Sequence, residues 1–241
     1  MAEPHPPSPS LQEKIAHNLK VVNQRIEAAC NQYGRNKDDV RLIAISKTKP
    51  VEAIQVAIDA GQLDFGENQI QEALAKIPNI SADNVRWHYI GPLQSNKTKH
   101  LPGNFHWWHT LQRLDIARRV SNKARELDTL VEALIQVNVI NDPAKSGVTK
   151  EELPQLIEQL AAAELPGIRL RGLMTIGPHG GTDEELRSCF SELRSLLETT
   201  RDTFNLADFD QLSMGMTNDM EQAIAEGATM VRVGSAIFGS R

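Results

Sequence analysis

The chain has 241 residues, of which 40% are hydrophobic and 24% are charged, the balance of an ordinary soluble globular protein. Its formal net charge of −5 argues against a nucleic-acid-binding protein with a broad basic face. No apolar run approaches the roughly 18 residues that a membrane span requires, and residues 1–10 (MAEPHPPSPS) lack the apolar core of a signal peptide. We therefore expect a disordered tail over 1–10, one domain over 11–241, and a cytoplasmic location.

Residues 11–34 form one amphipathic helical pattern, in which Leu11, Ile15, Leu19 and Val22 recur at helical spacing. From residue 40 onward, strand-like and helix-like segments alternate. The expected strands are 40–46, 63–68, 86–91, 106–111, 132–139, 168–176, 209–215 and 230–235. The expected helices are 50–61, 68–77, a short one over 92–101, 113–128, 149–164, 182–204 and 217–228.

Strands separated by helices indicate a parallel α/β fold, and eight strands are the number that closes a barrel. The sequence therefore predicts a single-domain (β/α)8 TIM barrel with an extra N-terminal helix. The alternative is an open doubly wound sheet, but the GxGxxG motif that usually follows its first strand is missing here.

Active sites of such barrels lie at the C-terminal ends of the strands. The strand-end candidates are Lys47, Glu67, Asn68, Gly91, Thr110, Asn138, Thr175, residues 213–217 and residues 232–235. Two of these segments, SMGMTND (213–219) and RVGS (232–235), follow strands seven and eight, where barrel enzymes frequently bind phosphate.

The two segments suit a phosphate. Ser213 and Thr217 offer hydroxyl donors, Gly215 and Gly234 let the backbone approach closely, and free N–H groups at a helix start attract an anion. Either segment alone is an ordinary turn or strand exit, but both at the two expected positions predict a phosphate site.

Lys47 follows the first strand and has the same parity as Ile43 and Ile45. Barrel interiors favour bulky branched side chains, so we expect the isoleucine face to point inward and Lys47 to continue it into the barrel mouth. The alternative is a snorkelling lysine with its ammonium in water. Lys49 shares the parity but lies beyond the strand, and we expect it to be solvated.

A lysine and a phosphate site in one mouth fit two chemistries. One is a Schiff-base aldolase that acts on a sugar phosphate, and the other is a lysine that holds pyridoxal 5'-phosphate (PLP). Arg232 could face the pyridine nitrogen of such a cofactor, form a salt bridge, or contact the phosphate.

The cysteines and the paired histidines do not indicate a metal site. Cys30 and Cys189 have no metal-ligand spacing and fit reduced cytosolic thiols. His106 and His109 lie three residues apart on a predicted strand, where they face opposite sides, so we expect no metal there.

Seven motifs occur in order: AISKTKP (44–50), FGENQIQE (65–72), WHYIGPLQSNK (87–97), VNVINDPAKSG (137–147), GLMTI (172–176), LSMGMTND (212–219) and VRVGSAIFG (231–239). Together they resemble the pyridoxal phosphate homeostasis protein family, from about residue 11 to the C-terminus. Gln69 departs from the larger residue that the family more often has after FGEN.

The resemblance implies a barrel like the N-terminal domain of alanine racemase, with PLP on Lys47 and Arg232 toward the pyridine nitrogen. It implies phosphate contacts from Ser213, Thr217 and the Gly234–Ser235 backbone. It also implies three contacts to the ring, from Asn68, Met174 and Met216; without the resemblance, the methionines would be assigned to the core.

The function implied is that of a non-catalytic PLP-binding protein that keeps free PLP low, supplies PLP-dependent apo-enzymes and affects amino- and keto-acid balance. The alternative is a PLP-dependent racemase-like enzyme without the second domain. A racemase needs a second base, which in the related racemases is a tyrosine of that domain; here Tyr33 and Tyr89 lie away from the predicted mouth. Lacking the domain through which racemases dimerise, the protein is expected to be a monomer.

Overall fold

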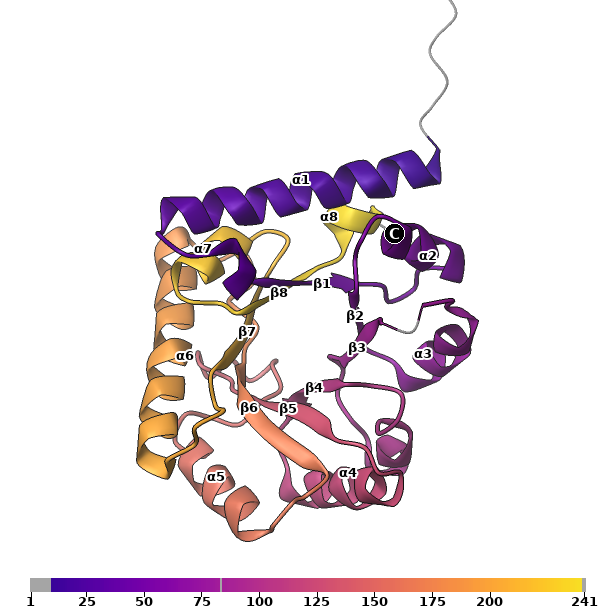
Figure 1. Cartoon of the computed structure of the whole chain (residues 1–241). Coiled ribbons are helices and arrows are strands. Elements are labelled where there is room, and N and C mark those ends of the chain that lie inside the picture. The colour runs from indigo at the N-terminus through magenta and orange to yellow at the C-terminus, as the bar shows by residue number, and fades with distance from the viewer. Residues whose placement is uncertain (1–9, 83, 240–241) are drawn as a thin grey trace, which may run out of the picture.

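The computed structural model describes residues 10–82 and 84–239. Eight parallel strands pair in chain order, and the last pairs with the first, so that the sheet closes into a barrel (Figure 1). The strands are β1 (Arg41–Ile45), β2 (Asp64–Glu67), β3 (Arg86–Tyr89), β4 (Trp107–Leu111), β5 (Val131–Gln136), β6 (Ile168–Met174), β7 (Gln211–Met216) and β8 (Met230–Val233). Each overlaps its predicted segment, and the pairing of β8 with β1 rules out the open doubly wound sheet.

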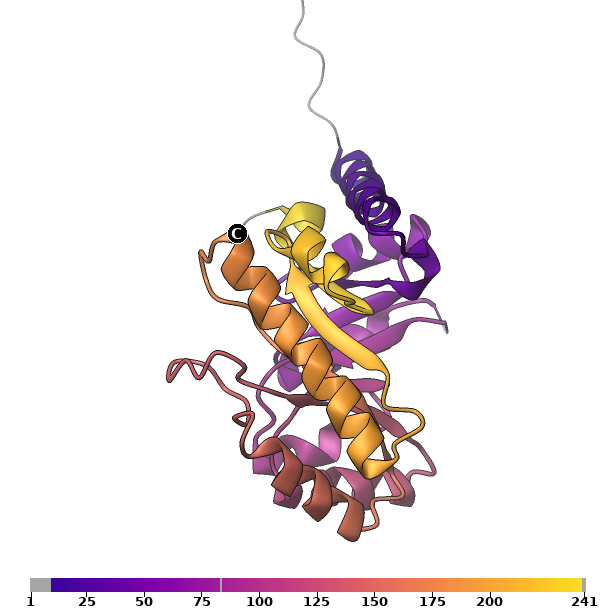
Figure 2. The ribbon, with the colours of Figure 1, turned by 90° about the vertical axis from the view of Figure 1, so that its left-hand side faces the viewer.

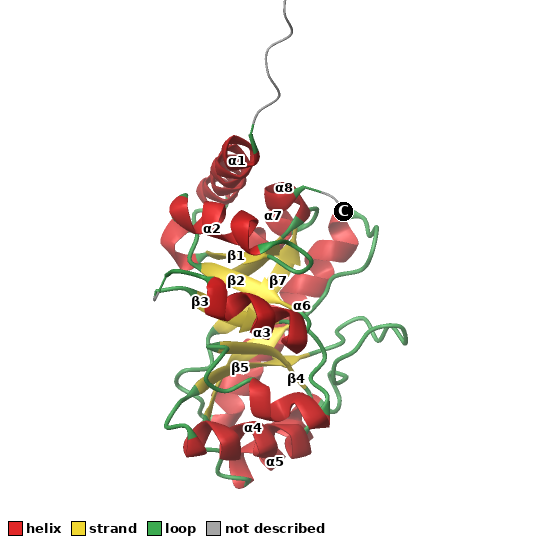
Figure 3. Cartoon of the chain, turned by 90° about the vertical axis from the view of Figure 1, so that its right-hand side faces the viewer, coloured by secondary structure: helices red, strands yellow, loops and turns green. Residues whose placement is uncertain are grey.

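Helices lie outside the strands (Figure 3). They are α1 (Leu11–Gln32), α2 (Val51–Asp59), α3 (Ile70–Lys76), α4 (Leu114–Glu126), α5 (Leu153–Ala162), α6 (Asp183–Phe204), α7 (Met220–Ala225) and α8 (Ser235–Phe238). Short 3-10 turns are η1 (Lys37–Asp39), η2 (Ile77–Asn79) and η3 (Ser95–His100). The short helix predicted over 92–101 is therefore the 3-10 turn η3, and α8 was not predicted. Within the described ranges, no helix combines the length and apolarity needed to cross a membrane.

The N-terminal helix α1 lies across one side of the barrel, against α2, α7 and α8 (Figures 1 and 2). Ser10 caps it, because its hydroxyl accepts from the Glu13 N–H at 3.2 Å and its own N–H donates to the Glu13 carboxylate at 2.7 Å. Ser10 therefore belongs to the helix cap and not to the predicted tail. Residues 1–9 of that tail lie outside the described residues.

The alternation of β1 decides which side chains enter the barrel. Ile43 and Ile45 pack in an interior cluster that includes Leu134, whereas Leu42 and Ala44 join the larger core between the strands and the helices. The predicted inward isoleucine face is confirmed. Side chains that follow Ile45 with the same parity are thereby aimed at the C-terminal mouth of the barrel.

Candidate functional site

A cavity of about 540 Å³ opens at the C-terminal ends of β1, β6, β7 and β8, and is called the mouth cavity below. Six of the predicted site residues line it: Lys47, Met216, Thr217, Arg232, Gly234 and Ser235. The barrel thus brings together, in one cavity, the amine that follows the first strand and side chains at the ends of the last two strands.

Lys47 lies directly above the inward isoleucines, and Ile45 itself lines the mouth cavity. Its ammonium has no hydrogen bond or ion pair with any residue in the described ranges. Lys49 differs, because its Nζ donates to the carbonyl oxygens of Phe238 at 3.2 Å and Gly239 at 3.0 Å, where α8 ends. Lys49 is partly exposed, as expected beyond the strand, but its ammonium is engaged, whereas the Lys47 amine has no such partner among the described residues.

The loop after Lys47 adopts an unusual backbone conformation. Thr48 has a φ of 62°, a left-handed value that a β-branched residue rarely adopts. Its backbone N–H donates to Glu72 Oε1 of α3, which fixes the turn. The backbone beside Lys47 is therefore held in a strained conformation by a side chain from the next helix.

Beneath this loop lies a buried ionic cluster. Lys76 Nζ donates to Ser46 O at 2.9 Å, to Glu67 Oε1 at 2.9 Å and to Glu72 Oε1 at 2.5 Å. The Ser46 hydroxyl also donates to Glu67 Oε1, at 2.7 Å. Burial raises the pKa of Glu67, and the hydrogen bonds from Ser46 and Lys76 offset only part of that rise. The cluster anchors the residue before Lys47 as well as the loop after it.

The segments after β7 and β8 meet across the cavity. Ser235 Oγ lies 3.4 Å from Thr217 Oγ1, so two hydroxyls from these loops are neighbours. From α1, Arg25 donates to the Thr217 carbonyl at 3.0 Å and forms an ion pair with Glu221 at 2.8 Å. Sequence reasoning missed Arg25, because the helical pattern of α1 does not distinguish it from the other polar residues of that helix.

Packing within the protein requires glycine at position 215 and leaves little room for a side chain at position 234. Gly215 has a φ of 90°, and a Cβ there would lie 2.5 Å from the Cβ of Ala223 in α7. A Cβ on Gly234 would lie 3.2 Å from the Cβ of Ile45. Gly215 does not line the mouth cavity, so its close approach is to a helix and not to a ligand.

Arg232 projects from β8 into the top of the barrel interior and is 5% exposed. One terminal guanidinium nitrogen donates to Ser213 Oγ at 2.7 Å and the other to Thr175 O at 2.9 Å. Burial lowers the pKa of Arg232 to about 10, so the side chain remains a cation at neutral pH. Its hydrogen-bond partners are neutral oxygens, the charge of Asp219 offsets part of the lowering of its pKa, and it lines the mouth cavity as a buried positive charge.

Besides Gly215, three predicted residues are not on the cavity wall. The fully buried Ser213 hydroxyl contacts His109 at 2.8 Å as well as Arg232, which leaves it no free position for a phosphate and corrects that expectation. Met174 is buried in the interior cluster with Ile45. Asn68 follows β2, and its carbonyl oxygen packs against Gly91.

Lys145 lines the mouth cavity although it was not predicted as a site residue. Its Nζ donates to the carbonyl oxygens of Gly177 at 2.6 Å and Ile176 at 3.3 Å, which joins the loop after β5 to the loop after β6. It lies within the motif VNVINDPAKSG, and that motif was the available signal. The two predicted strand-four histidines separate, because His106 accepts from the Trp87 N–H whereas His109 is inside the barrel.

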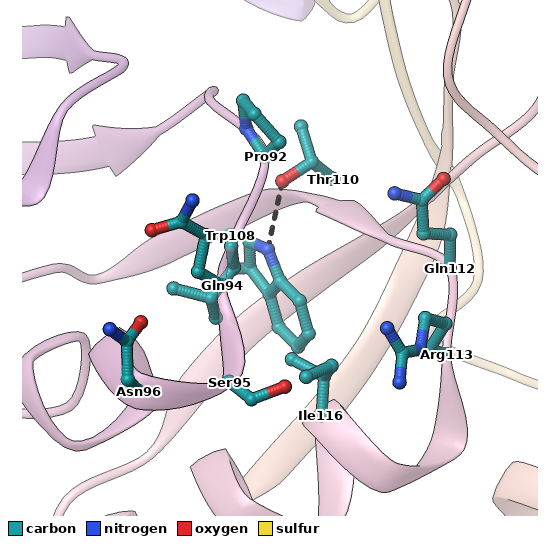
Figure 4. A pocket seen from close by; sticks show the side chains of 10 residues that line it. Pro92, Gln94, Ser95, Asn96, Trp108, Thr110, Gln112, Arg113 and Ile116 are labelled. Atoms are coloured by element: carbon teal, nitrogen blue, oxygen red, sulfur yellow. Dashed lines mark hydrogen bonds between the residues drawn. The ribbon is translucent and has the colours of Figure 1, made fainter.

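A second cavity, of about 430 Å³, lies beside the ends of β3 and β4 (Figure 4). Trp108 forms its back wall and donates from Nε1 to Thr110 Oγ1 at 2.9 Å. Gln94, Ser95 and Asn96 of the motif WHYIGPLQSNK extend along its edge. This cavity does not include Lys47 or the β7 and β8 loops.

Comparison with known proteins gives these sites a context. A family model described as "Alanine racemase, N-terminal domain" matches residues 12–241. The pyridoxal phosphate homeostasis protein of Escherichia coli (strain K12) is 44% identical over 237 residues, covering 94% of this chain and 97% of the relative. That of Haemophilus influenzae is 42% identical over 229 residues, covering 94% and 96%. The chain belongs to the pyridoxal phosphate homeostasis protein family.

Solved structures agree with this membership of the pyridoxal phosphate homeostasis protein family. PipY of Synechococcus elongatus PCC7942, with PLP bound, is similar with a TM-score of 0.83 and 34% identity, over 93% of this chain and 100% of that chain. An alanine racemase of Clostridium difficile 630 has a TM-score of 0.74 at 14% identity, over 95% of this chain and 57% of that chain, and shares the fold. The family and the barrel predicted from the motifs are confirmed.

Proposed function

We propose that this chain binds PLP in the mouth cavity, with the amine of Lys47 as the covalent attachment point. The observation that supports this most directly is the placement of Lys47. Its unengaged amine lines the same cavity as a buried cation, Arg232, and two neighbouring hydroxyls, Thr217 and Ser235. A phosphorylated aldehyde with a heteroaromatic ring needs these three kinds of partner.

The donor set fits the cofactor in chemical type. Thr217 Oγ1, Ser235 Oγ and the Gly234–Ser235 backbone would bind the phosphate, and Met216, which is 38% exposed at the cavity, would contact the ring. Arg232 would face the ring nitrogen. A guanidinium cannot accept a proton, so it would keep that nitrogen unprotonated and PLP a weaker electron sink.

Lys47 would hold the cofactor through a C=N bond that replaces the aldehyde C=O, with the aldehyde oxygen and the two amine hydrogens leaving as water. The chain's own residues supply what this requires: the inward isoleucines aim the lysine, and the Glu72–Thr48 bond fixes the turn after it. The openness of the cavity to solvent would let the reverse hydrolysis release the cofactor.

We infer a carrier and regulator of free PLP, and not a racemase. The sequence has two tyrosines, and neither lines the mouth cavity: Tyr89 is 3% exposed and donates to Pro92 O, and Tyr33 ends α1. A tyrosine base opposite Lys47 is therefore not available within the chain. The names of the relatives support a role in PLP homeostasis. We further propose PLP-dependent apo-enzymes as recipients and a monomer as the working state.

The absorbance spectrum of the purified protein with added PLP tests the binding proposal. We expect a band of covalently bound cofactor that Lys47→Ala abolishes. Lys49→Ala is the matched control, because it removes a neighbouring ammonium whose contacts are with Phe238 and Gly239. A band that survives Lys47→Ala, or that only Lys49→Ala removes, would overturn the assignment.

An amino-acid racemisation assay tests the non-catalytic role. The PLP-loaded protein should show no turnover of alanine near the enzyme-like rate of about 1 s⁻¹. Turnover at that rate would make the protein an enzyme and would direct attention to His179 and Asp219, which line the mouth cavity.

A further inference from the structure

A line of hydrogen-bonded polar side chains crosses the barrel interior. Asp64 Oδ1 lies 2.9 Å from His88 Nε2, and His88 Nδ1 lies 2.9 Å from His109 Nε2. His109 Nδ1 lies 2.8 Å from Ser213 Oγ, and Ser213 Oγ lies 2.7 Å from Arg232. All five residues are at most 5% exposed. Barrel interiors are usually filled by bulky branched side chains, so this polar line needs an explanation.

The chemistry at the two ends fixes the direction of every bond. A guanidinium only donates, so Ser213 Oγ accepts from Arg232. A carboxylate only accepts, so His88 Nε2 has the hydrogen that it donates to Asp64. A neutral imidazole has one donor and one acceptor. His88 Nδ1 therefore accepts from His109 Nε2, and His109 Nδ1 accepts from the Ser213 hydroxyl.

The charges around the line support this assignment. Burial lowers the pKa of His88 to about 4, and it lowers the pKa of His109 well below its ordinary value, so both rings are neutral at neutral pH. Burial alone would raise the pKa of Asp64, but the hydrogen bonds from Arg86 and His88, together with the charge of Arg86, outweigh it and hold that pKa well below its usual range. Arg86 pairs with Asp64 at 2.6 Å, so the line ends on an ionised, compensated carboxylate.

We propose that Asp64, His88, His109 and Ser213 are positioning residues for Arg232. The proton of Ser213 is committed to His109, so a Ser213 lone pair always faces one guanidinium nitrogen, while Thr175 O accepts from the other. The remaining N–H groups of Arg232 are left to the mouth cavity. This inference rests on the proposed function, since the guanidinium so placed is the one that would face the ring nitrogen of PLP.

The first test uses wild-type protein with ¹⁵N-labelled histidine and no cofactor. Nitrogen–proton correlation spectra at pH 7 to 8 should show both His88 and His109 as neutral Nε2–H tautomers. His88→Gln and His109→Gln assign the signals. An Nδ1–H tautomer or an imidazolium at either ring would reverse the direction of the bonds and overturn the proposal. Because no PLP is present, this result stands even if the proposed function fails.

The second test uses PLP titration of His109→Leu, His109→Gln and Ser213→Ala, none of which contacts the mouth cavity. Leucine removes both the donor and the acceptor, whereas glutamine supplies one of each. We expect His109→Leu and Ser213→Ala to raise the Kd for PLP about tenfold, the size of one charge-assisted hydrogen bond, and to shift the absorbance maximum of bound PLP. His109→Gln should restore most of both.

Two outcomes of the titration would overturn the proposal. One is that Ser213→Ala binds PLP with the wild-type Kd and spectrum. Ser213→Ala is the smallest of the three changes, so it decides the test if His109→Leu does not fold. The other is that His109→Gln and His109→Leu weaken PLP binding equally and lower the free energy of unfolding equally. The polar line would then only stabilise the fold and would not position Arg232. The Lys47→Ala spectrum above separates either result from a failure to bind PLP at all.

Discussion

Glu72 accepts a hydrogen bond from the backbone N–H of Thr48, the residue that follows Lys47 and has a left-handed φ of 62°. The same carboxylate pairs with Lys76 at 2.5 Å. One helix, α3, therefore supplies both groups that fix the backbone on either side of the proposed attachment lysine. The geometry of Lys47 depends on residues that never touch the cavity.

Removal of this anchor should loosen Lys47. Glu72→Ala is expected to raise the Kd for PLP about tenfold and to lower the free energy of unfolding by about 1–2 kcal/mol, because a backbone donor and an ammonium each lose a partner. Absorbance titration and urea unfolding measure the two effects. Glu52→Ala, an exposed acidic change in the first turn of α2, is the control. Wild-type affinity in Glu72→Ala would show that the loop holds its conformation unaided.

The buried ion pair of Lys76 and Glu67 should contribute strongly to the free energy of unfolding. Glu67 is fully buried, so Lys76→Met leaves its carboxylate without a compensating charge and should cost about 3–5 kcal/mol at pH 8. Loss of Lys76 raises the already elevated pKa of Glu67. A folded-state pKa above the unfolded value adds stability as pH falls, so the loss should be smaller at pH 5.

The double variant Lys76→Met with Glu67→Gln separates charge from packing. It should recover most of the stability lost in Lys76→Met, measured by urea unfolding at pH 8. If the double variant is as unstable as the single one, the cost comes from the packing of Lys76 and not from the buried carboxylate.

The interior histidines should make the protein acid-sensitive. Both have folded-state pKa values below the ordinary value of about 6.5, so the unfolded chain binds their protons first and stability falls as pH drops below about 6.5. Burial is the main cause for both rings. Arg41 and Arg86 lower the pKa of His88 further while Asp64 raises it, and His88, Arg232 and Arg41 lower that of His109. Each ring should contribute about 1.4 kcal/mol per pH unit between about pH 6 and 5.

Urea unfolding at pH 7.5, 6 and 5 measures this dependence. His109→Gln removes one titrating ring and should show a slope shallower by about 1.4 kcal/mol per pH unit. Asp64 adds a separate loss, since its depressed pKa gives stability above about pH 4 that disappears as pH falls further. An unchanged slope in His109→Gln would mean that His109 is protonated in the folded state.

Contacts from helix α1 should increase the affinity of the mouth cavity for PLP. Arg25→Ala removes the hydrogen bond to the Thr217 carbonyl and the ion pair with Glu221. Both side chains of that ion pair are about one-third exposed. We expect the Kd for PLP to rise about threefold to tenfold, with less than about 1 kcal/mol lost in unfolding, because a partly exposed pair contributes little. Arg119→Ala on α4 is the exposed control. Equal Kd values in both variants would contradict the support assigned to α1.

The barrel and the place of Lys47 were predictable because they follow from local periodicity. Alternation of apolar residues in β1 gave the inward face, and eight such strands gave the closed sheet. The length of the strands and the exact ends of the short helices were less accurate, as the 3-10 turn η3 and the unpredicted α8 show. Their ends are set by tertiary contacts that a single strand or helix pattern does not contain.

The site residues divide in the same way. Thr217 and Ser235 were found because loops after the last strands share one mouth. Ser213 was assigned to the phosphate because parity along β7 does not reveal that a histidine 104 residues earlier occupies its hydroxyl. Lys76 was missed for a related reason: it continues the buried face of Ile70 and Ala73, and an ammonium on an apolar face is explained only by its ion-pair partners.

The contact between α1 and α8 also bears on how the protein is made. Asn18 donates to the carbonyl of Ile237, so the bond joins positions 219 residues apart. A chain emerging from the ribosome has to wait for almost all of its length before α1 finds α7 and α8, and loop closure over such a separation is slow. Until then α2 is the only one of its three neighbouring helices that α1 can pack against, and the mouth is the last part of the molecule to be completed during translation.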